Sequence, residues 1–272
     1  MTNKAARFRE LHNRPEPLLL PNPWDAGTAR LLAGLGFEAL ATTSLGVANT
    51  HGRPSATAEE VLTNFQEINN ATSLPVNVDL ENGFADDPDD VAATVARSAV
   101  TGAAGASIED FTGDREKPIY DFEIAVDRIR AAAQSKGGLV LTARAENLLY
   151  GVADINDTIN RLQAFSEAGA DVLYAPGLRT LAEIRTVVSA VDKPVNVVMG
   201  FADPSITVEQ LAEVGVRRIS IGAAFSRLVL DRFMADAREM RAGRFGFVAD
   251  LTPVTELQRA FRRGAEGTAQ DR

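Results

Sequence analysis

The 272-residue sequence contains no cysteine, which excludes disulfide bonds, thiolate metal sites and a cysteine nucleophile or acid. No run of residues approaches the roughly 18 consecutive apolar residues of a membrane span. The first residues, MTNKAARFRELHNRPEP, are charged and lack the apolar segment of a signal peptide. We therefore expect a soluble, cytoplasmic protein that does not act at a membrane.

The sequence also lacks the basic patterns that are typical of nucleic-acid-binding proteins. The chain has 28 Lys and Arg residues against 37 Asp and Glu residues, and the net charge is -9. No basic stripe with interleaved aromatic residues is present, and we interpret RAFRR at 259–263 as a helix end. A nucleic-acid partner is therefore not expected.

Apolar runs of strand length alternate with amphipathic runs of helix length, and the pair occurs eight times. Four of the helical runs end in glycine just before a strand, in GLGFEAL, TGAAGASI, EAGADVL and EVGVRRI. The predicted strands are 18–20, 39–43, 76–80, 105–109, 139–144, 172–175, 195–199 and 218–222. The predicted helices are 25–35, 58–71, 88–101, 121–134, 156–168, 180–190, 207–214 and 223–242.

This alternation predicts an α/β protein with a (β/α)8 TIM barrel over residues 1–243. An open, doubly wound sheet is the alternative, but no GxGxxG or GxxxxGK[ST] motif follows the first strand. Residues 244–272 form an extension whose Leu251, Val254, Leu257 and Phe261 recur at helical spacing. We expect this helix to pack on a neighbouring subunit.

Acidic residues gather where barrel chemistry is located, at the C-terminal ends of the strands. In VNVDLENGFADD, Asp79 and Glu81 are two residues apart and so face the same way, and Glu109 ends the next strand. Three converging carboxylates near a single arginine, Arg144, are costly unless a cation joins them. Oxygen ligands without His or Cys favour Mg²⁺, or Mn²⁺, bound by Asp79, Glu81 and Glu109.

The remaining groups at this rim suit an anionic substrate. The guanidinium of Arg144 matches a carboxylate or a phosphate. The backbone amides of Ser44, Leu45 and Gly46 can hold another anionic oxygen. A 2-oxo acid fits both features, because its ketone and carboxylate oxygens bind a metal and the enolate formed at the ketone is stabilised there.

Each candidate residue also has a structural interpretation. Asp79 alone could be a helix N-cap, and Arg144 could be a structural partner of Glu109 or Glu146. Among the other polar residues, we expect Asp86, Asp87, Asp110 and Glu146 to be solvated or capping, and His12 of the N-terminal helix to be at the surface. His51 is expected to be an acid or base, or merely an exposed loop residue. Trp24 is expected in the core or at the rim, and Tyr174 is expected to bind substrate or to reach toward solvent.

Several motifs in order resemble the isocitrate lyase/phosphoenolpyruvate mutase superfamily, and its short bacterial mutase-like members most. These motifs are LPNPWDAGTARLLAGLGFEALATTSLGVA, LPVNVDLENGF, GAAGASIED and LTARAE, and the resemblance covers nearly the whole chain. It implies a (β/α)8 barrel whose last helix is exchanged between subunits, usually in a homotetramer. It also implies that Asp79 ligates Mg²⁺ directly, with Glu81 and Glu109 as the further acids.

The resemblance also implies roles for substrate-binding residues. Arg144 matches the arginine that holds the substrate carboxylate. The segment Thr43, Ser44, Leu45 and Gly46 matches the loop whose hydroxyl and amides bind a pyruvyl carboxylate, and Trp24 with Asp25 lies in a region that lines the same pocket.

Departures from the family's motifs narrow the expected activity. Lyase members carry a K-[KR]-C-G-H loop whose cysteine donates a proton, whereas IEDFTGDREK, residues 108–117, has no cysteine. The proton donor is then His51 or water. Phosphonomutases use an asparagine in this loop, and none lies between Glu109 and Asp121. We expect decarboxylation or carbon-carbon cleavage of an oxaloacetate-like acid through a pyruvate enolate. Phosphonopyruvate or phosphoenolpyruvate chemistry and a non-catalytic 2-oxo acid binding barrel are the alternatives.

Overall fold

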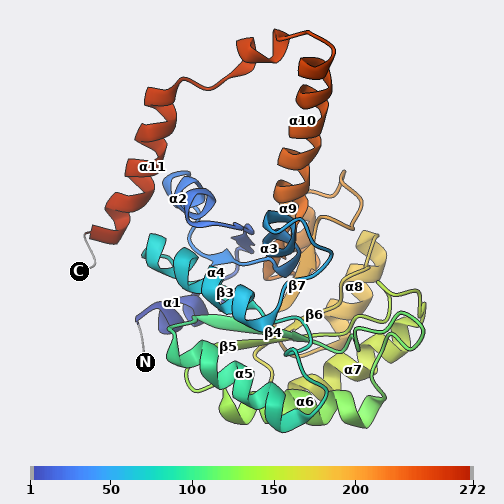
Figure 1. The fold of residues 1–272 in the computed structure, drawn as a ribbon. Coiled ribbons are helices and arrows are strands. Elements are labelled where there is room, and N and C mark those ends of the chain that lie inside the picture. Colours follow the sequence, from blue (N-terminus) through green and yellow to red (C-terminus); the bar gives the residue numbers. More distant parts are fainter. Residues whose placement is uncertain (1–2, 270–272) are drawn as a thin grey trace.

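The computed structural model describes residues 3–269 and shows eight parallel strands in a nearly closed barrel with helices around it (Figure 1). This confirms the predicted (β/α)8 architecture. The elements in chain order are α1 (Asn3–His12), β1 (Leu18–Leu20), α2 (Ala26–Gly34), β2 (Leu40–Ala41), α3 (Ser44–Thr50), α4 (Ala58–Ala71), β3 (Val76–Asp79), α5 (Pro88–Val100), β4 (Gly105–Glu109), α6 (Phe122–Ser135), β5 (Val140–Arg144), α7 (Ile155–Glu167), β6 (Val172–Tyr174), α8 (Leu181–Ala190), β7 (Val195–Val198), α9 (Val208–Glu213), β8 (Arg218–Ser220), α10 (Ala224–Arg241), the 3-10 helix η1 (Gly246–Asp250) and α11 (Val254–Ala269).

The sheet runs in the order β1-β8-β7-β6-β5-β4-β3-β2, so β1 and β2 are its edges. These edges are joined by one backbone hydrogen bond, in which the Ala41 amide donates to the Pro21 carbonyl at 3.1 Å. Asn22 completes the seam, since its amide nitrogen donates to the Thr42 carbonyl at 3.1 Å and its oxygen accepts from the backbone N–H of Gly222 at 3.0 Å.

Local sequence explains where the helices begin. Thr57, Thr180 and Thr207 each cap a helix in a reciprocal capping box with Glu60, Glu183 and Gln210. The outward sides of the strands and the inward sides of the helices form one large apolar core. Helix α3 was not predicted: Thr43 caps it, and its seven residues lie in a segment that we expected to be a loop.

The inside of the barrel has a separate apolar cluster at its N-terminal end. Helix α1 contributes Phe8 and Leu11, which pack with Leu18 and Val172 of the strands. The expectation of a surface His12 was wrong, because this side chain is buried beside Phe8 and burial lowers its pKa to about 4. The N-terminal end of the barrel is therefore closed by apolar packing.

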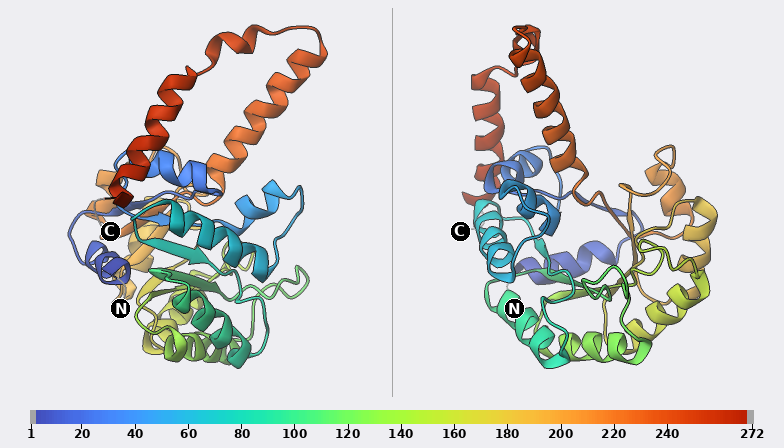
Figure 2. Two further views of the ribbon diagram at one scale, coloured as in Figure 1. Left: turned by 60° about the vertical axis from the view of Figure 1, so that its left-hand side comes forward. Right: turned by 45° about the vertical axis from the view of Figure 1, so that its right-hand side comes forward.

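The C-terminal helices extend away from the barrel. Helix α10 projects from the end of β8, and α11 returns to lie on α2 of the same chain (Figure 2). Gly264 permits this crossing, since a Cβ atom there would lie 1.9 Å from the Arg30 carbonyl oxygen. Exchange of this helix between subunits remains a prediction. Among the described residues, no helix is both long and apolar enough to span a lipid bilayer.

Candidate functional site

Arg144 is the centre of a buried cluster of charges at the C-terminal end of β5. Its NH1 lies 3.2 Å from Oδ1 of Asp79, its NH2 lies 2.9 Å from Oε2 of Glu109, and its Nε lies 2.8 Å from Oε1 of Glu146. The ring of Tyr174, at the end of β6, lies 5.0 Å from the guanidinium carbon. Four neighbouring segments of the barrel thus converge on one guanidinium.

The other oxygen of Asp79 is held by the start of α3. Oδ2 accepts hydrogen bonds from the Ser44 amide at 3.1 Å and from the Ser44 hydroxyl at 3.0 Å. The Gly46 amide donates to the hydroxyl of the capping Thr43 at 3.3 Å, and Leu45 is exposed. Two of the three amides predicted to bind substrate therefore have partners within the chain, and their role toward a substrate remains a prediction.

Glu81 follows β3 with an unusual backbone. Its φ is 48°, and Phe84 in the same loop has a φ of 58°, both in the left-handed region that disfavours residues with a side chain. The Glu81 carbonyl accepts from the Glu109 amide at 2.9 Å. Burial, and then the charge of Asp79, raise the pKa of the Glu81 carboxyl.

The cluster contains more carboxyl groups than cationic groups. Burial raises the pKa of Glu109 well above its ordinary value despite Arg144, and Glu146, Asp79 and Glu81 raise it further. Burial raises the pKa of Glu146 to about 7. Burial lowers the pKa of Arg144, but Glu109 and the other carboxylates raise it more, so the guanidinium stays charged. One guanidinium thus pairs with three carboxyl groups, and burial favours the protonated forms of Glu109 and Glu146.

From the sequence we expected the wrong environment for two acids of this region, although the alternative that Glu146 is a partner of Arg144 is confirmed. Glu146 is fully buried, and Asp110 is buried with an ion pair to Arg161 at 3.1 Å and a hydrogen bond from the Glu146 amide at 2.8 Å. The expectation that both are solvated or capping was wrong. Asp110 directly follows β4 and Glu146 lies two residues after the end of β5, in IED and RAE, and this position was the available indication.

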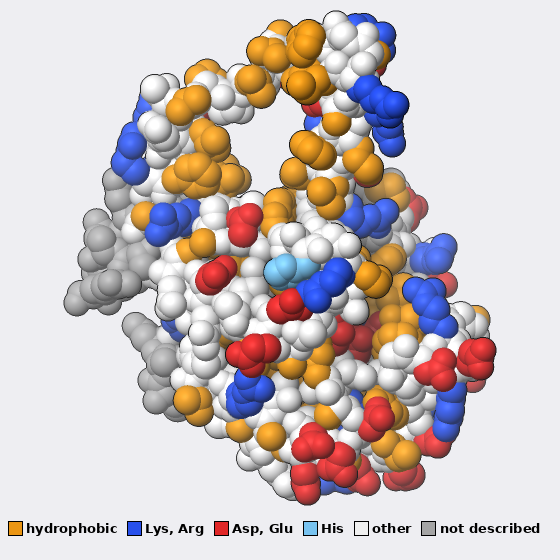
Figure 3. Space-filling model, viewed as in Figure 1, with side chains coloured by type: hydrophobic (Ala, Val, Ile, Leu, Met, Phe, Trp, Pro, Cys, Tyr) orange, Lys and Arg blue, Asp and Glu red, His pale blue; other side chains and the backbone are white. Residues whose placement is uncertain are grey.

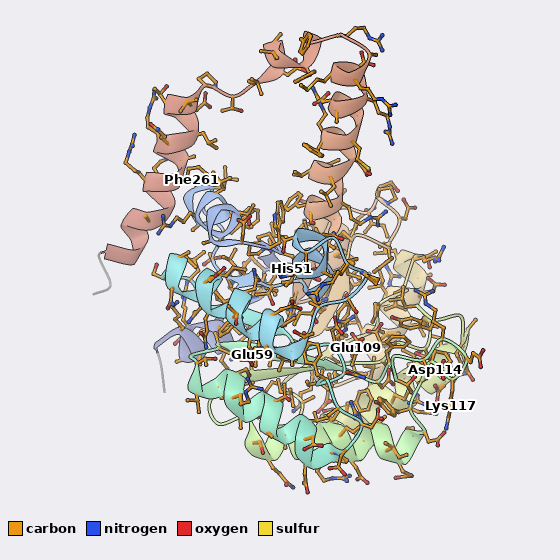
Figure 4. The ribbon with its side chains drawn as sticks, viewed as in Figure 1. His51, Glu59, Glu109, Asp114, Lys117 and Phe261 are labelled. Carbon is orange, nitrogen blue, oxygen red and sulfur yellow. The ribbon has the colours of Figure 1, made fainter. Side chains whose placement is uncertain are left out.

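The structure places the remaining candidates differently. Asp25 caps α2 by accepting from the Thr28 amide at 2.7 Å, and with Trp24 it lines a surface cavity of about 350 Å³. His51 lines the same cavity, and Figure 4 shows it at the end of α3, apart from Glu109. Trp24, Asp25 and His51 are therefore not joined to the acidic cluster by this cavity. Of the further acids, Asp87 caps α5 as expected.

The donor set at the cluster suits a hard divalent cation. Within residues 3–269, no group of three or more acidic or histidine side chains is arranged as a metal site. Mg²⁺ does not need one, because it is typically bound by one or two carboxylates with water and substrate completing its shell. The carboxylate oxygens fit Mg²⁺, with Asp79, Glu81 and Glu109 as the residues that would hold it.

The chain is similar to a known protein family, to a relative of known activity and to solved structures. The model of the phosphoenolpyruvate phosphomutase family matches residues 8–241. The 2-methylisocitrate lyase of Escherichia coli K12 is 34% identical over 223 residues, which cover 77% of this chain and 75% of that enzyme. A solved structure from Burkholderia cenocepacia J2315, whose description leaves lyase and mutase open, is 48% identical, covers 95% of both chains and has a TM-score of 0.91. A solved oxaloacetate acetylhydrolase holding its product oxalate is 28% identical, covers 98% of this chain and 96% of its own, and has a TM-score of 0.84.

Proposed function

Because the chain belongs to the phosphoenolpyruvate phosphomutase family, we propose that it is a Mg²⁺-dependent enzyme that cleaves a carbon-carbon bond of a small 2-oxo acid such as oxaloacetate. The observation that carries the proposal is the buried cluster in which Arg144 faces Asp79, Glu109 and Glu146. Its excess of carboxyl groups over cationic groups favours a divalent cation, and its guanidinium favours a carboxylate.

Each residue of the cluster has a chemical role in this proposal. Arg144 has five N–H donors and uses three in the contacts described, so the others can donate to a substrate carboxylate. Mg²⁺, when bound, polarises the ketone of the substrate. Loss of the terminal carboxylate as CO₂ leaves an enolate, which takes one proton to give pyruvate. Glu146, with a pKa of about 7, can hold and release a proton near neutral pH.

The proposal is tested by turnover. Oxaloacetate supplied with Mg²⁺ should yield pyruvate faster than Mg²⁺ alone produces it, and a chelator should stop the enzymatic part. Phosphonopyruvate is assayed in parallel, because phosphorus-carbon cleavage is the competing activity. Arg130→Ala should keep the wild-type rate, since Arg130 lies on the exposed side of α6 and pairs with Asp127. Binding of 2-oxo acids without turnover would favour a binding protein, and no binding at all would refute the proposal.

We further propose that the chain assembles as a homo-oligomer, a tetramer in particular. Helix α10 follows β8 but projects away from the barrel (Figure 2). Leu19, on the outer side of β1, is 41% exposed. Apolar side chains line α10 and the connection to α11 around an opening above the barrel (Figure 3). Leu251 and Val254 of the predicted apolar stripe are also exposed, while Phe261 lies against Gly27 of α2.

Light scattering tests this assembly. The full chain should be an oligomer at micromolar concentration, and a chain truncated before Val248 should give smaller species, because the apolar surface of the extension is removed. A monomeric full-length chain would contradict the proposal.

A further inference from the structure

The loop between β3 and α5, which carries Glu81, is held by a side chain from outside the charged cluster. Arg128 of α6 is 1% exposed and is among the largest fully buried side chains. Its NH1 donates to the carbonyl oxygens of Ala85 at 2.6 Å and Asp86 at 2.5 Å, and its NH2 donates to the Asn82 carbonyl. One guanidinium therefore binds three main-chain carbonyls of a single loop.

The loop that Arg128 binds has a disfavoured backbone. Glu81 and Phe84 both have left-handed φ values, of 48° and 58°. Such conformations persist only where the surrounding structure holds them in place. Burying the Arg128 guanidinium is itself unfavourable, and burial lowers its pKa. The three carbonyl contacts offset that cost and supply the restraint that the loop requires.

The same arginine connects this loop to the next one. The Tyr120 ring lies 4.1 Å from the guanidinium carbon, and the Tyr120 hydroxyl donates to the carboxylate of Asp86. Tyr120 ends the loop after β4, in which Phe111 and Ile119 pair as an antiparallel bridge. Figure 4 shows Asp114 and Lys117 in the outer part of this loop. The loops after β3 and β4 are thus joined by the contacts among Arg128, Tyr120 and Asp86.

We propose that Arg128 is a positioning residue: with Tyr120 and Asp86 it fixes the loop after β3 so that the Glu81 carboxylate faces Asp79 and Glu109. The inference rests on the proposed function, because it concerns the residues that would hold Mg²⁺. Side chains that orient metal ligands from outside the coordination shell change metal affinity by about 10- to 100-fold when they are replaced.

Arg128→Lys tests the role, because lysine keeps the charge but cannot reach three carbonyls with a planar fork. Calorimetry should show Mg²⁺ affinity lower by at least about tenfold. Hydrogen exchange of the metal-free protein should speed up at the amides of Gly83 and Phe84, which are bonded to the Leu80 carbonyl at 2.7 Å and to Asn82 Oδ1 at 3.1 Å. Arg130→Lys on the same helix is the control and should change neither value.

The outcomes separate this inference from the proposed function. If the wild-type chain binds Mg²⁺ and Arg128→Lys has the same affinity and exchange rates, the positioning role is wrong while the proposed function stands. If the wild-type chain binds no Mg²⁺, the proposed function fails and the exchange rates alone decide the positioning role. If Arg128→Lys does not fold, Tyr120→Phe is measured instead, and unchanged affinity and exchange then overturn the inference.

Discussion

The two ends of the barrel differ in what fills them. At the N-terminal end, Phe8 and Leu11 of α1 close the lumen with apolar contacts. At the C-terminal end, Arg144 is surrounded by buried carboxylates with raised pKa values. The closed end contributes to folding stability, while the charged end gives up stability by burying like charges, as sites that bind a cation do.

Phe8→Ala should produce the largest change in stability. Phe8 is fully buried, and removal of a buried phenylalanine side chain lowers the free energy of unfolding by about 3–5 kcal/mol. Mg²⁺ affinity should not change, because the residue lies at the other end of the barrel. Urea denaturation and calorimetry measure the two quantities. The matched control is Val100→Ala, at an exposed position that should tolerate it. A large loss of Mg²⁺ affinity in a folded Phe8→Ala protein would contradict the separation of the two ends.

Arg144→Ala should weaken the binding of the substrate acid. The substitution removes the positive charge that faces Asp79, Glu109 and Glu146, and losing a bidentate charged contact costs about 2–5 kcal/mol. The affinity for oxaloacetate should therefore fall by at least about tenfold. Fluorescence or calorimetric titration with the acid measures it. Binding equal to that of the wild-type chain would remove Arg144 from the substrate site.

The fold could be predicted from the sequence because its periodic signals are local. Each strand is an apolar run, and threonine or aspartate marks the start of several helices, so all eight strands were placed correctly. The cluster of Asp79, Glu109 and Arg144 could be predicted because these residues are at the C-terminal ends of neighbouring strands. The burial of His12 could not be predicted, because it depends on contacts between segments far apart in the chain, and the position of Glu146 after β5 was the only indication of its burial. Helix α3 was not predicted, because seven residues are too few to show a helical hydrophobic period.

Glu146→Gln should reduce the pH dependence of stability in chelator-treated protein. The native pKa of about 7 exceeds the ordinary value of 4.5, so the native state keeps a proton that the unfolded chain has lost. The free energy of unfolding of the wild-type chain should therefore fall as pH rises from about 4.5 to about 7. Glutamine cannot ionise, so the variant should show a smaller fall. Urea denaturation at pH 5 and pH 8 measures it, and an identical pH dependence in both proteins would show that Glu146 does not titrate in this range.

The most direct test of the charged end is a calorimetric titration of Mg²⁺ into the wild-type chain and Asp79→Ala. Asp79 is the carboxylate that contacts both Ser44 and Arg144, and it is the residue expected to bind the metal directly. The wild-type chain should bind one Mg²⁺ per subunit, and Asp79→Ala should lose this binding while remaining folded. Equal Mg²⁺ affinity in the two proteins would contradict the assignment of the metal site to this cluster.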